Sequence, residues 1–295
     1  MLRIYTTIFW FSILLVMASA VLLFTYGLNF GVDFKGGSVI ELNFSGTIPL
    51  LEDIRGKLTE SKLPEITVNY FGDNGVILRT RELSEVEHQD VLFVLRENFS
   101  GVEEKKFESI GPIIGKELKN KSVIAAFLVL FAVIVYIAIV FRKLSKALSS
   151  WIMGFAAIVA LLHDVIIPLG VFAVLGRFYG VEISAVFVAA VLTILGYSIA
   201  DTVVVFDRVR ENVIRGGSVR QTADFPKIVH RSILQTLTRS LNTTFTTLLS
   251  LFAIYFFGGE SIRYFALALI MGIFLGAYSS IFVASPLLVW WSKKR

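Results

Sequence analysis

The sequence predicts an α-helical integral membrane protein with six transmembrane helices and one small α+β domain between the first and the second. Three observations lead to this fold class. Of the 295 residues, 55% are hydrophobic and only 17% are charged, with a mean hydropathy of +0.74, which is not typical of a soluble domain. Six apolar runs are long enough to cross about 30 Å of hydrocarbon. A polar stretch of 93 residues, long enough for a small domain, separates the first two runs.

The six apolar runs set the order of the predicted spans. They cover residues 6–28, 122–141, 151–175, 183–206, 241–257 and 265–291. The fifth run is short, so its helix is expected to begin a few residues earlier. The first is too long for the apolar core of a cleaved signal peptide, so we expect it to stay as an anchor. The predicted organisation is a first transmembrane helix at 1–28, a domain at 29–121, and a five-helix bundle at 122–295 that includes a basic cytoplasmic loop at 207–240.

The distribution of basic residues predicts the orientation of the spans. Two basic residues, Arg177 and Arg263, lie in the short loops on one side of the membrane. Fourteen lie on the other side, at Arg3, within 142–146, within 208–239 and at 293–295. Basic residues near span ends are retained in the cytoplasm, so both termini are expected there and the domain at 29–121 outside. The net charge of +5 therefore reflects topology and needs no nucleic-acid partner.

The domain at 29–121 shows alternating strand and helix patterns. Strands are predicted at 38–44, 66–71, 76–81 and 103–110, and helices at 49–61 and 84–98. Asp73-Asn74-Gly75 is a tight-turn signal, and Ser84 with Glu87 is a capping box at the start of the second helix. The resulting β-α-β-β-α-β order is that of a ferredoxin-like split unit. With a single histidine, His88, and no cysteine or nucleotide-binding loop, a binding or force-transmitting module is favoured over an enzyme.

Asp201 is the only charged residue in the 24 residues of 183–206. An ionisable group at that depth is costly unless partnered, and it marks an ion path or a proton relay. Thr193, Tyr197 and Asp201 recur at four-residue steps and share one helix face. The next span carries a second polar stripe, made of Arg239, Thr243, Thr246 and Ser250.

We expect these two stripes to face each other. An ionised Asp201 is then stabilised by Arg239, while a protonated Asp201 is neutral in the low-dielectric interior. The alternative is that both side chains reach the cytoplasmic interface, since charged Asp207 follows closely on the same helix.

His163 and Asp164 lie near the centre of the third predicted span. A histidine beside a carboxylate can relay protons near neutral pH. Neighbouring helical residues point about 100° apart, so the two side chains cannot face the same partner. Packing or hydrogen bonding stays open for His163, and Asp164 is the stronger functional candidate.

Four motifs together resemble those of the SecD/SecF family of bacterial protein-export membrane subunits. They are Gly31-Val-Asp-Phe-Lys-Gly-Gly37, His163-Asp164, the segment 196–212 and the segment 239–247. The resemblance covers essentially the whole chain. Phe34 in the first motif and the small size of the domain favour the SecF branch over the SecD branch. The resemblance implies membership of the resistance-nodulation-division superfamily and a joint helix bundle with SecD.

By position, the resemblance assigns residues to roles. It makes Asp201 the carboxylate of a proton path and Arg239 its partner. From their positions in the predicted spans, Thr243, Asp164 and His163 are expected to belong to the same path. It makes Asp33, Gly36 and Gly37 a periplasmic-face motif, whose glycines permit a turn closed to other residues; an ordinary exit loop is the alternative. It also implies a cytoplasmic motif at Asp207, Arg208, Arg210 and Glu211. The alternative for these residues is a solvated helix face with ion pairs.

The resemblance implies proton-driven pulling or release of exported chains at the periplasmic side of the bacterial cytoplasmic (inner) membrane. No enzymatic activity and no cofactor are expected, protons being the coupling ion. The expected partners are SecD, the SecYEG translocon, unfolded exported polypeptides and membrane lipid, with YajC and YidC as further candidates and no nucleic acid. Two alternatives stay open: a proton-driven half-transporter of the same superfamily that exports lipid or small molecules, and a structural scaffold of the translocon.

Overall fold

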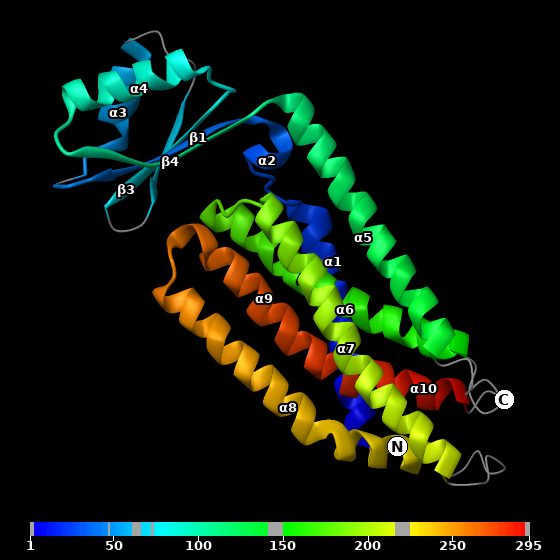
Figure 1. Cartoon of the computed structure of the whole chain (residues 1–295). Helices are drawn as coiled ribbons and strands as arrows, with labels where there is room; N and C mark the ends of the chain where they lie inside the picture. Colours follow the sequence, from blue (N-terminus) through cyan, green and yellow to red (C-terminus); the bar gives the residue numbers. More distant parts are fainter. Residues whose placement is uncertain are drawn as a thin grey trace. The chain divides into compact units, whose positions relative to one another are not determined.

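The computed structural model describes residues 3–46, 48–60, 66–71, 74–140, 150–215 and 225–292. The chain forms two compact units (Figure 1). One, here called the membrane unit, consists of Met1–Asn29 together with Ile124–Arg295, and the other, the α/β unit, is Phe30–Val123. The predicted domain at 29–121 has nearly the same bounds as the α/β unit.

Six helices in the described part of the chain are long and apolar enough to span a membrane, which confirms the predicted number. The first five are α1 (Arg3–Tyr26), α5 (Pro112–Val140), α6 (Ser150–Tyr179), α7 (Ala185–Arg215) and α8 (Phe225–Phe257). The sixth is a continuous helix made of α9 (Glu260–Ser279), the π-helical segment η2 (Ser280–Ala284) and α10 (Ser285–Ser292). The fifth helix begins well before the predicted start of its apolar run, as its short length suggested.

The predicted basic loop at 207–240 is largely helical, which corrects that expectation. α7 continues to Arg215 and α8 begins at Phe225, while residues 216–224 lie outside the described residues. Glu211 pairs with Arg208 at 2.6 Å and with Arg215 at 2.6 Å. Ion pairs three and four residues apart stabilise a helix. The charges therefore extend α7 as a polar helix instead of ending it.

α7 packs against α6, α8 and α9; Figure 1 shows it beside them in the helix bundle. The close approach of α7 and α9 depends on glycines. A Cβ at Gly276 would lie 3.0 Å from the Cβ of Ser198, and one at Gly272 would overlap the side chain of Ile194. Small residues at helix contacts are typical of membrane helices, where backbones pack closely.

Many large apolar side chains lie on the outer surface of the membrane unit, as expected for side chains that face lipid. The side chains of Trp10, Phe24, Phe131 and Phe257 are largely exposed, Phe24 to 92%. Burying such groups in hydrocarbon is favourable, whereas water would leave them poorly solvated.

The α/β unit shows the predicted β-α-β-β-α-β order. Its elements are β1 (Gly37–Phe44), α3 (Leu51–Glu60), β2 (Thr67–Phe71), β3 (Gly75–Thr80), α4 (Glu85–Asn98) and β4 (Val102–Ile110). The strands form one antiparallel sheet in the order β2-β3-β1-β4. Both helices lie on the same face of that sheet (Figure 1). Ile40, Leu42 and Phe44 on β1 form the core with Ile54 on α3 and Leu92 on α4.

Local signals in the α/β unit place its second helix. Ser84 caps α4, and the side chain of Glu87 accepts from the Ser84 backbone N–H at 2.8 Å, so the predicted capping box is present. Of the predicted turn, Asn74 and Gly75 precede or begin β3, while Asp73 lies outside the described residues.

Candidate functional site

Asp201 on α7 is half-buried and joins three helices. Its carboxylate accepts hydrogen bonds from the Oγ of Ser240 on α8 and from the Oγ of Ser280 in η2, the latter at 2.6 Å. A serine hydroxyl can donate to an ionised carboxylate and can also accept from a protonated one. The site can therefore bond Asp201 in either charge state.

The predicted pairing of Asp201 with Arg239 is not found among the ion pairs of the described residues, and Ser240 occupies the facing position instead. The side chains of Arg239 and Thr243 are exposed in this chain. Thr243 donates within its own helix, to the Arg239 carbonyl at 3.0 Å. The physical reason is the helix phase: residues 239 and 240 point about 100° apart, so only one of them faces α7.

The predicted polar stripe of α8 does share one face, but that face is exposed. Arg239, Thr243, Thr246 and Ser250 all lie on it. The stripe turned inward follows the same four-residue rhythm and consists of hydroxyl residues, namely Ser232, Thr236, Ser240 and Thr244. Sequence reasoning missed this second stripe, although its spacing is the signal that would have found it.

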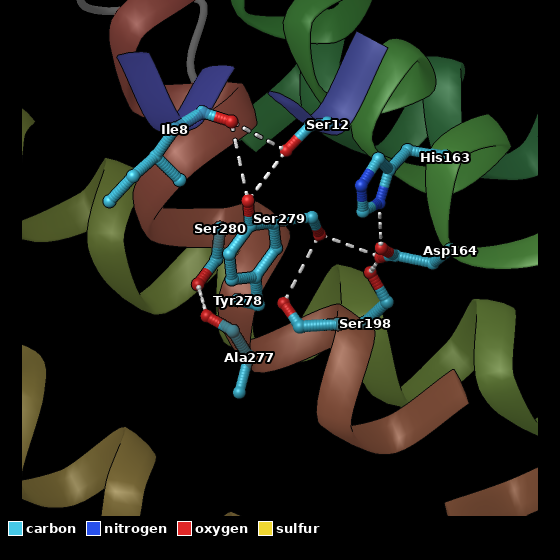
Figure 2. Close-up of polar contacts among 10 residues, drawn as sticks. Ile8, Ser12, His163, Asp164, Ser198, Ala277, Tyr278, Ser279 and Ser280 are labelled. Atoms are coloured by element: carbon cyan, nitrogen blue, oxygen red, sulfur yellow. Dashed lines mark hydrogen bonds and ion pairs between the residues drawn. The ribbon is translucent and has the colours of Figure 1, made fainter. Parts of the chain in front are cut away.

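Asp164 on α6 is a second carboxylate, and it is fully buried. It accepts from three donors, the Oγ of Ser198 on α7 at 2.5 Å, the Oγ of Ser279 on α9 at 2.7 Å and the Nδ1 of His163 at 2.9 Å (Figure 2). Ionised carboxylates have about four lone-pair positions, so three donors satisfy most of them. Such bonding is what makes a charge at this depth tolerable.

His163 is buried beside Asp164, and its ring contacts a tyrosine on α9. Its ring lies nearly parallel to that of Tyr278, with centroids 5.8 Å apart and an interplanar angle of 16°. Its Nε2 is buried and has no hydrogen-bond partner among the described residues. Because Nδ1 faces the carboxylate, a neutral His163 that donates through Nδ1 fits an ionised Asp164.

The first sequence motif forms a closely packed corner within the α/β unit. Asp33, half-buried, lies in the short helix α2 (Val32–Lys35), which sequence reasoning did not predict. Gly36 and Gly37 have φ values of +80° and +126°, which L side chains rarely adopt, so the prediction of a turn closed to other residues is confirmed. A Cβ at Gly36 would lie 2.7 Å from the Cα of Pro112, and one at Gly37 2.6 Å from the carbonyl oxygen of Thr80. The corner thus holds the start of β1 against the start of α5.

The predicted cytoplasmic motif forms ion pairs along α7. Arg208 contacts Glu211 at 2.6 Å, and Arg210 contacts Asp207 at 3.4 Å. The next residue, Asn212, donates to Ser232 and Gln235 on α8, each at 2.8 Å. This part of α7 is therefore fixed to the first half of α8 by an amide, a contact that charge patterns alone did not reveal.

The chemistry available to this site is that of two carboxylates among hydroxyl groups. Within the described ranges, no group of three or more His, Asp and Glu side chains is arranged to hold a metal ion. These features define the class of the protein, a multi-pass membrane protein with ionisable groups inside its helix bundle.

Comparison with known proteins identifies the family. Residues 91–294 match the family described as protein export membrane protein SecD/SecF, C-terminal, and residues 21–48 match the SecD/SecF GG motif. The chain belongs to the SecD/SecF family.

Its relatives include a protein translocase subunit SecF from Thermobaculum terrenum, 42% identical, covering 96% of this chain and 90% of that protein. Another is a protein translocase subunit SecDF from Brucella abortus, 39% identical over 89% of this chain. The crystal structure of SecDF, a translocon-associated membrane protein from Thermus thermophilus, is similar with a TM-score of 0.81 and 35% identity, over 99% of this chain. This chain spans 38% of that SecDF chain and 33% of the Brucella one.

Proposed function

We propose that this chain works as the SecF-type subunit of a bacterial protein translocase and that proton binding at Asp201 drives the work. Membership of the family supports the role in protein translocation, which is that of a transport subunit and not of an enzyme. The observation that carries the proton proposal is the setting of Asp201, a half-buried carboxylate inside a membrane-length helix, bonded only to hydroxyls of two other helices among the described residues. Intramembrane carboxylates of this kind mark ion and proton pathways.

Protonation of Asp201 changes the bonds that join three helices. Hydrogen bonds to an ionised acceptor are roughly twice as strong as those between neutral groups. The contacts with Ser240 and Ser280 are therefore strong when Asp201 is ionised and weaker when it is neutral. A charge crossing the membrane field contributes roughly 2.3 kcal/mol per 100 mV, comparable with the few kcal/mol that separate two conformers of a protein.

The exposed polar face of α7 and α8 supports pairing with SecD. Thr193, Arg239, Asn242, Thr243 and Thr246 are exposed on these two helices, and such groups are costly against lipid. The SecDF relatives hold additional chain beyond the part that matches here. A SecD subunit against this face places Arg239 and Thr243 at the interface, close to the Ser240 side of Asp201, where they take part in the proton path with Asp164 and His163. Protons are then the coupling ion, and no further cofactor is required.

The basic residues support an orientation with both termini in the cytoplasm of a bacterium and the α/β unit in the periplasm. There the unit meets unfolded exported polypeptides next to the SecYEG translocon, with YajC and YidC as further neighbours. The chain has no cysteine, so single cysteines report on topology. Glu97→Cys on α4 is expected to react with an impermeant reagent in spheroplasts, whereas Ile214→Cys on α7 is expected to be protected. Reaction of Ile214→Cys without permeabilisation contradicts this orientation.

The test of the proton proposal is Asp201→Asn, with the exposed Asp90→Asn on α4 as the matched control. The amide resembles the protonated acid in shape but cannot cycle its charge. Cells with Asp201→Asn are expected to keep ATP-driven export, to lose the proton-dependent part and to show no further loss when an uncoupler is added. Asp90→Asn is expected to behave like the unmodified protein. Normal export with normal uncoupler sensitivity in Asp201→Asn contradicts the proposal and favours a structural scaffold.

A further inference from the structure

Three consecutive residues at the junction of α9 and η2 contact three other helices. The Tyr278 hydroxyl lies 2.7 Å from the Oγ of Ser12 on α1, Ser279 donates to Asp164 on α6, and Ser280 donates to Asp201 on α7. Figure 2 shows Tyr278 directed toward Ser12 and Ile8 and Ser279 directed toward Asp164. We call Tyr278, Ser279 and Ser280 the hydroxyl triad. It joins the buried Asp164 and the half-buried Asp201 to α1 within one helical turn.

Each hydroxyl of the triad has a second acceptor within reach. Ser280 Oγ lies 2.6 Å from Asp201 and 2.9 Å from the Ala277 carbonyl. Ser279 Oγ lies 2.7 Å from Asp164 and 3.2 Å from the Gly276 carbonyl. The Tyr278 hydroxyl can donate to Ser12 or, at 3.3 Å, to the Ile8 carbonyl. A hydroxyl has one hydrogen to donate, so each member can exchange its acceptor without leaving a donor unsatisfied.

The triad lies where the α-helix gives way to a π-helix. Ser280 is the first residue of η2, and its carbonyl accepts from the Oγ of Ser285 at 2.7 Å. Pro286 follows and has no N–H to donate into the helix. Interruptions of this kind are places where a helix bends, and π-helical segments occur often at functional sites. A small shift of the triad therefore needs no break in a regular α-helix.

We propose that the hydroxyl triad couples the charge state of Asp201 to the position of α1, an inference that rests on the proposed function. When Asp201 is ionised, Ser280 donates to it and holds η2 against α7. When Asp201 takes up a proton, Ser280 turns its hydrogen to the Ala277 carbonyl, and the bond between η2 and α7 weakens. Ser279 and Tyr278 move with Ser280 because they are its neighbours in the chain. Tyr278 then carries the shift to Ser12, and α1 leads along the chain to Phe30.

The ionisable groups next to this path lie on four helices, α1, α6, α7 and α8. On α1 and α8 they are Tyr5 and His230, whose hydroxyl and Nδ1 lie 3.0 Å apart. Asp164 and His163 reach it from α6 through Ser279 and Tyr278. Arg239 on α8 precedes Ser240, and Asp207 on α7 follows Asp201 in the sequence. Asp201 is the member of this set that bonds directly to η2, so the response is assigned to it and is expected to vanish in Asp201→Asn.

The test measures two distances at low and at neutral pH, on the full chain reconstituted with SecD in liposomes. Each distance is measured between spin labels on two introduced cysteines. The first pair, Ile214→Cys on α7 with Leu234→Cys on α8, reports the local response to protonation. The second pair, Leu14→Cys on α1 with Leu234→Cys, reports its transmission to α1. These three side chains are exposed, so labels do not disturb the core. Both distances are expected to shift with pH and to lose that shift in Asp201→Asn.

Tyr278→Phe removes one hydroxyl of the triad and separates the inference from the proposed function. It is expected to abolish the pH shift of the α1 pair and to keep that of the α7–α8 pair, whose retained distance also shows that the variant is folded. Tyr136→Phe, at a half-exposed tyrosine on α5, is the matched control and is expected to keep both shifts.

Any other result contradicts either the coupling through the hydroxyl triad or the proposed proton binding at Asp201. A persistent α1 shift in Tyr278→Phe, or an α1 pair that does not respond while the α7–α8 pair does, overturns the coupling and leaves the proposed function standing. Absence of any pH shift in the α7–α8 pair of the otherwise unmodified chain overturns proton binding at Asp201, and the coupling with it.

Discussion

The two units of this protein place their polar groups in opposite ways. In the α/β unit, the core consists of apolar side chains such as Ile40 and Leu92, and most of the charges lie on the surface. In the membrane unit, Asp164 is fully buried and Asp201 half-buried, while large apolar side chains such as Phe24 face outward. The role of a polar residue therefore has to be interpreted differently in the two units. A surface charge in the α/β unit is explained by solvation, whereas a buried carboxylate among membrane helices calls for a function.

The partners of the charges differ in the same way. In the α/β unit they are opposite charges, as in the pair of Lys57 with Glu60 at 3.0 Å. Exposed pairs of this kind contribute little, because water and salt screen them. In the membrane unit, four of the five donors to Asp164 and Asp201 are serine hydroxyls. A hydroxyl bonds both the charged and the neutral acid, whereas a fixed opposite charge favours only the charged one.

The largest expected effect follows from removing the buried carboxylate. Asp164→Ala leaves the hydroxyl of Ser198 and the Nδ1 of His163 without their present acceptor, and a buried unsatisfied donor destabilises by about 1–3 kcal/mol. The exposed Asp90→Ala on α4 is expected to change stability by less than about 0.5 kcal/mol. Denaturation of both variants in detergent measures the difference. Equal stability of the two variants contradicts this expectation, because it means that the hydrogen bonds of Asp164 do not contribute to the stability of the membrane unit.

The smallest expected effect belongs to a surface carboxylate of the α/β unit. The hydrogen bond from Arg81, together with those from Ser84, lowers the pKa of Glu87 from its ordinary 4.5 to about 2. A carboxyl whose pKa is lowered by folding adds stability above its unfolded pKa, and that stability is lost as the pH falls toward the folded value. Glu87→Gln keeps an acceptor for the cap but removes the charge.

This variant is therefore expected to melt slightly below the unmodified α/β fragment, residues 38–110, at pH 7. The two melting temperatures are expected to converge between about pH 4.5 and pH 2. Thermal unfolding followed by circular dichroism measures both. A gap that is unchanged at pH 2 shows that packing, and not the ion pair, accounts for the effect.

Local signals explain what the sequence alone could predict. The capping box of Ser84 and Glu87 is a short-range motif, so the start of α4 was predictable. The sequence also singled out Asp201 as a candidate, because a lone charge in an apolar run is costly unless it is partnered, and the fold supplies hydroxyl partners for it. The β-α-β-β-α-β order of the α/β unit was predictable from its alternating strand and helix patterns.

The residues that contact Asp201 and Asp164 could be identified only from the tertiary structure. Arg239 and Ser240 both belong to four-residue stripes of α8, and only the rotation of that helix decides which stripe faces α7. That rotation is set by packing along the whole length of α8 from Phe225, well outside the apolar run. The π-helical segment was equally hidden, because Pro286 signals an interruption without specifying its form. Tyr278 and Ser279 therefore emerged as contacts only from the fold.

The central claim is that Asp201 takes up and releases a proton within the membrane unit. Infrared difference spectroscopy between low and neutral pH, on the full chain with SecD in liposomes, measures this directly through the C=O stretching band of a protonated carboxyl group. We expect the low-pH carboxylic-acid band to contain a component from a carboxyl group shielded from water, which is lost in Asp201→Asn and persists in Asp90→Asn. An identical band in all three proteins contradicts it, because the titrating carboxyl group then lies elsewhere.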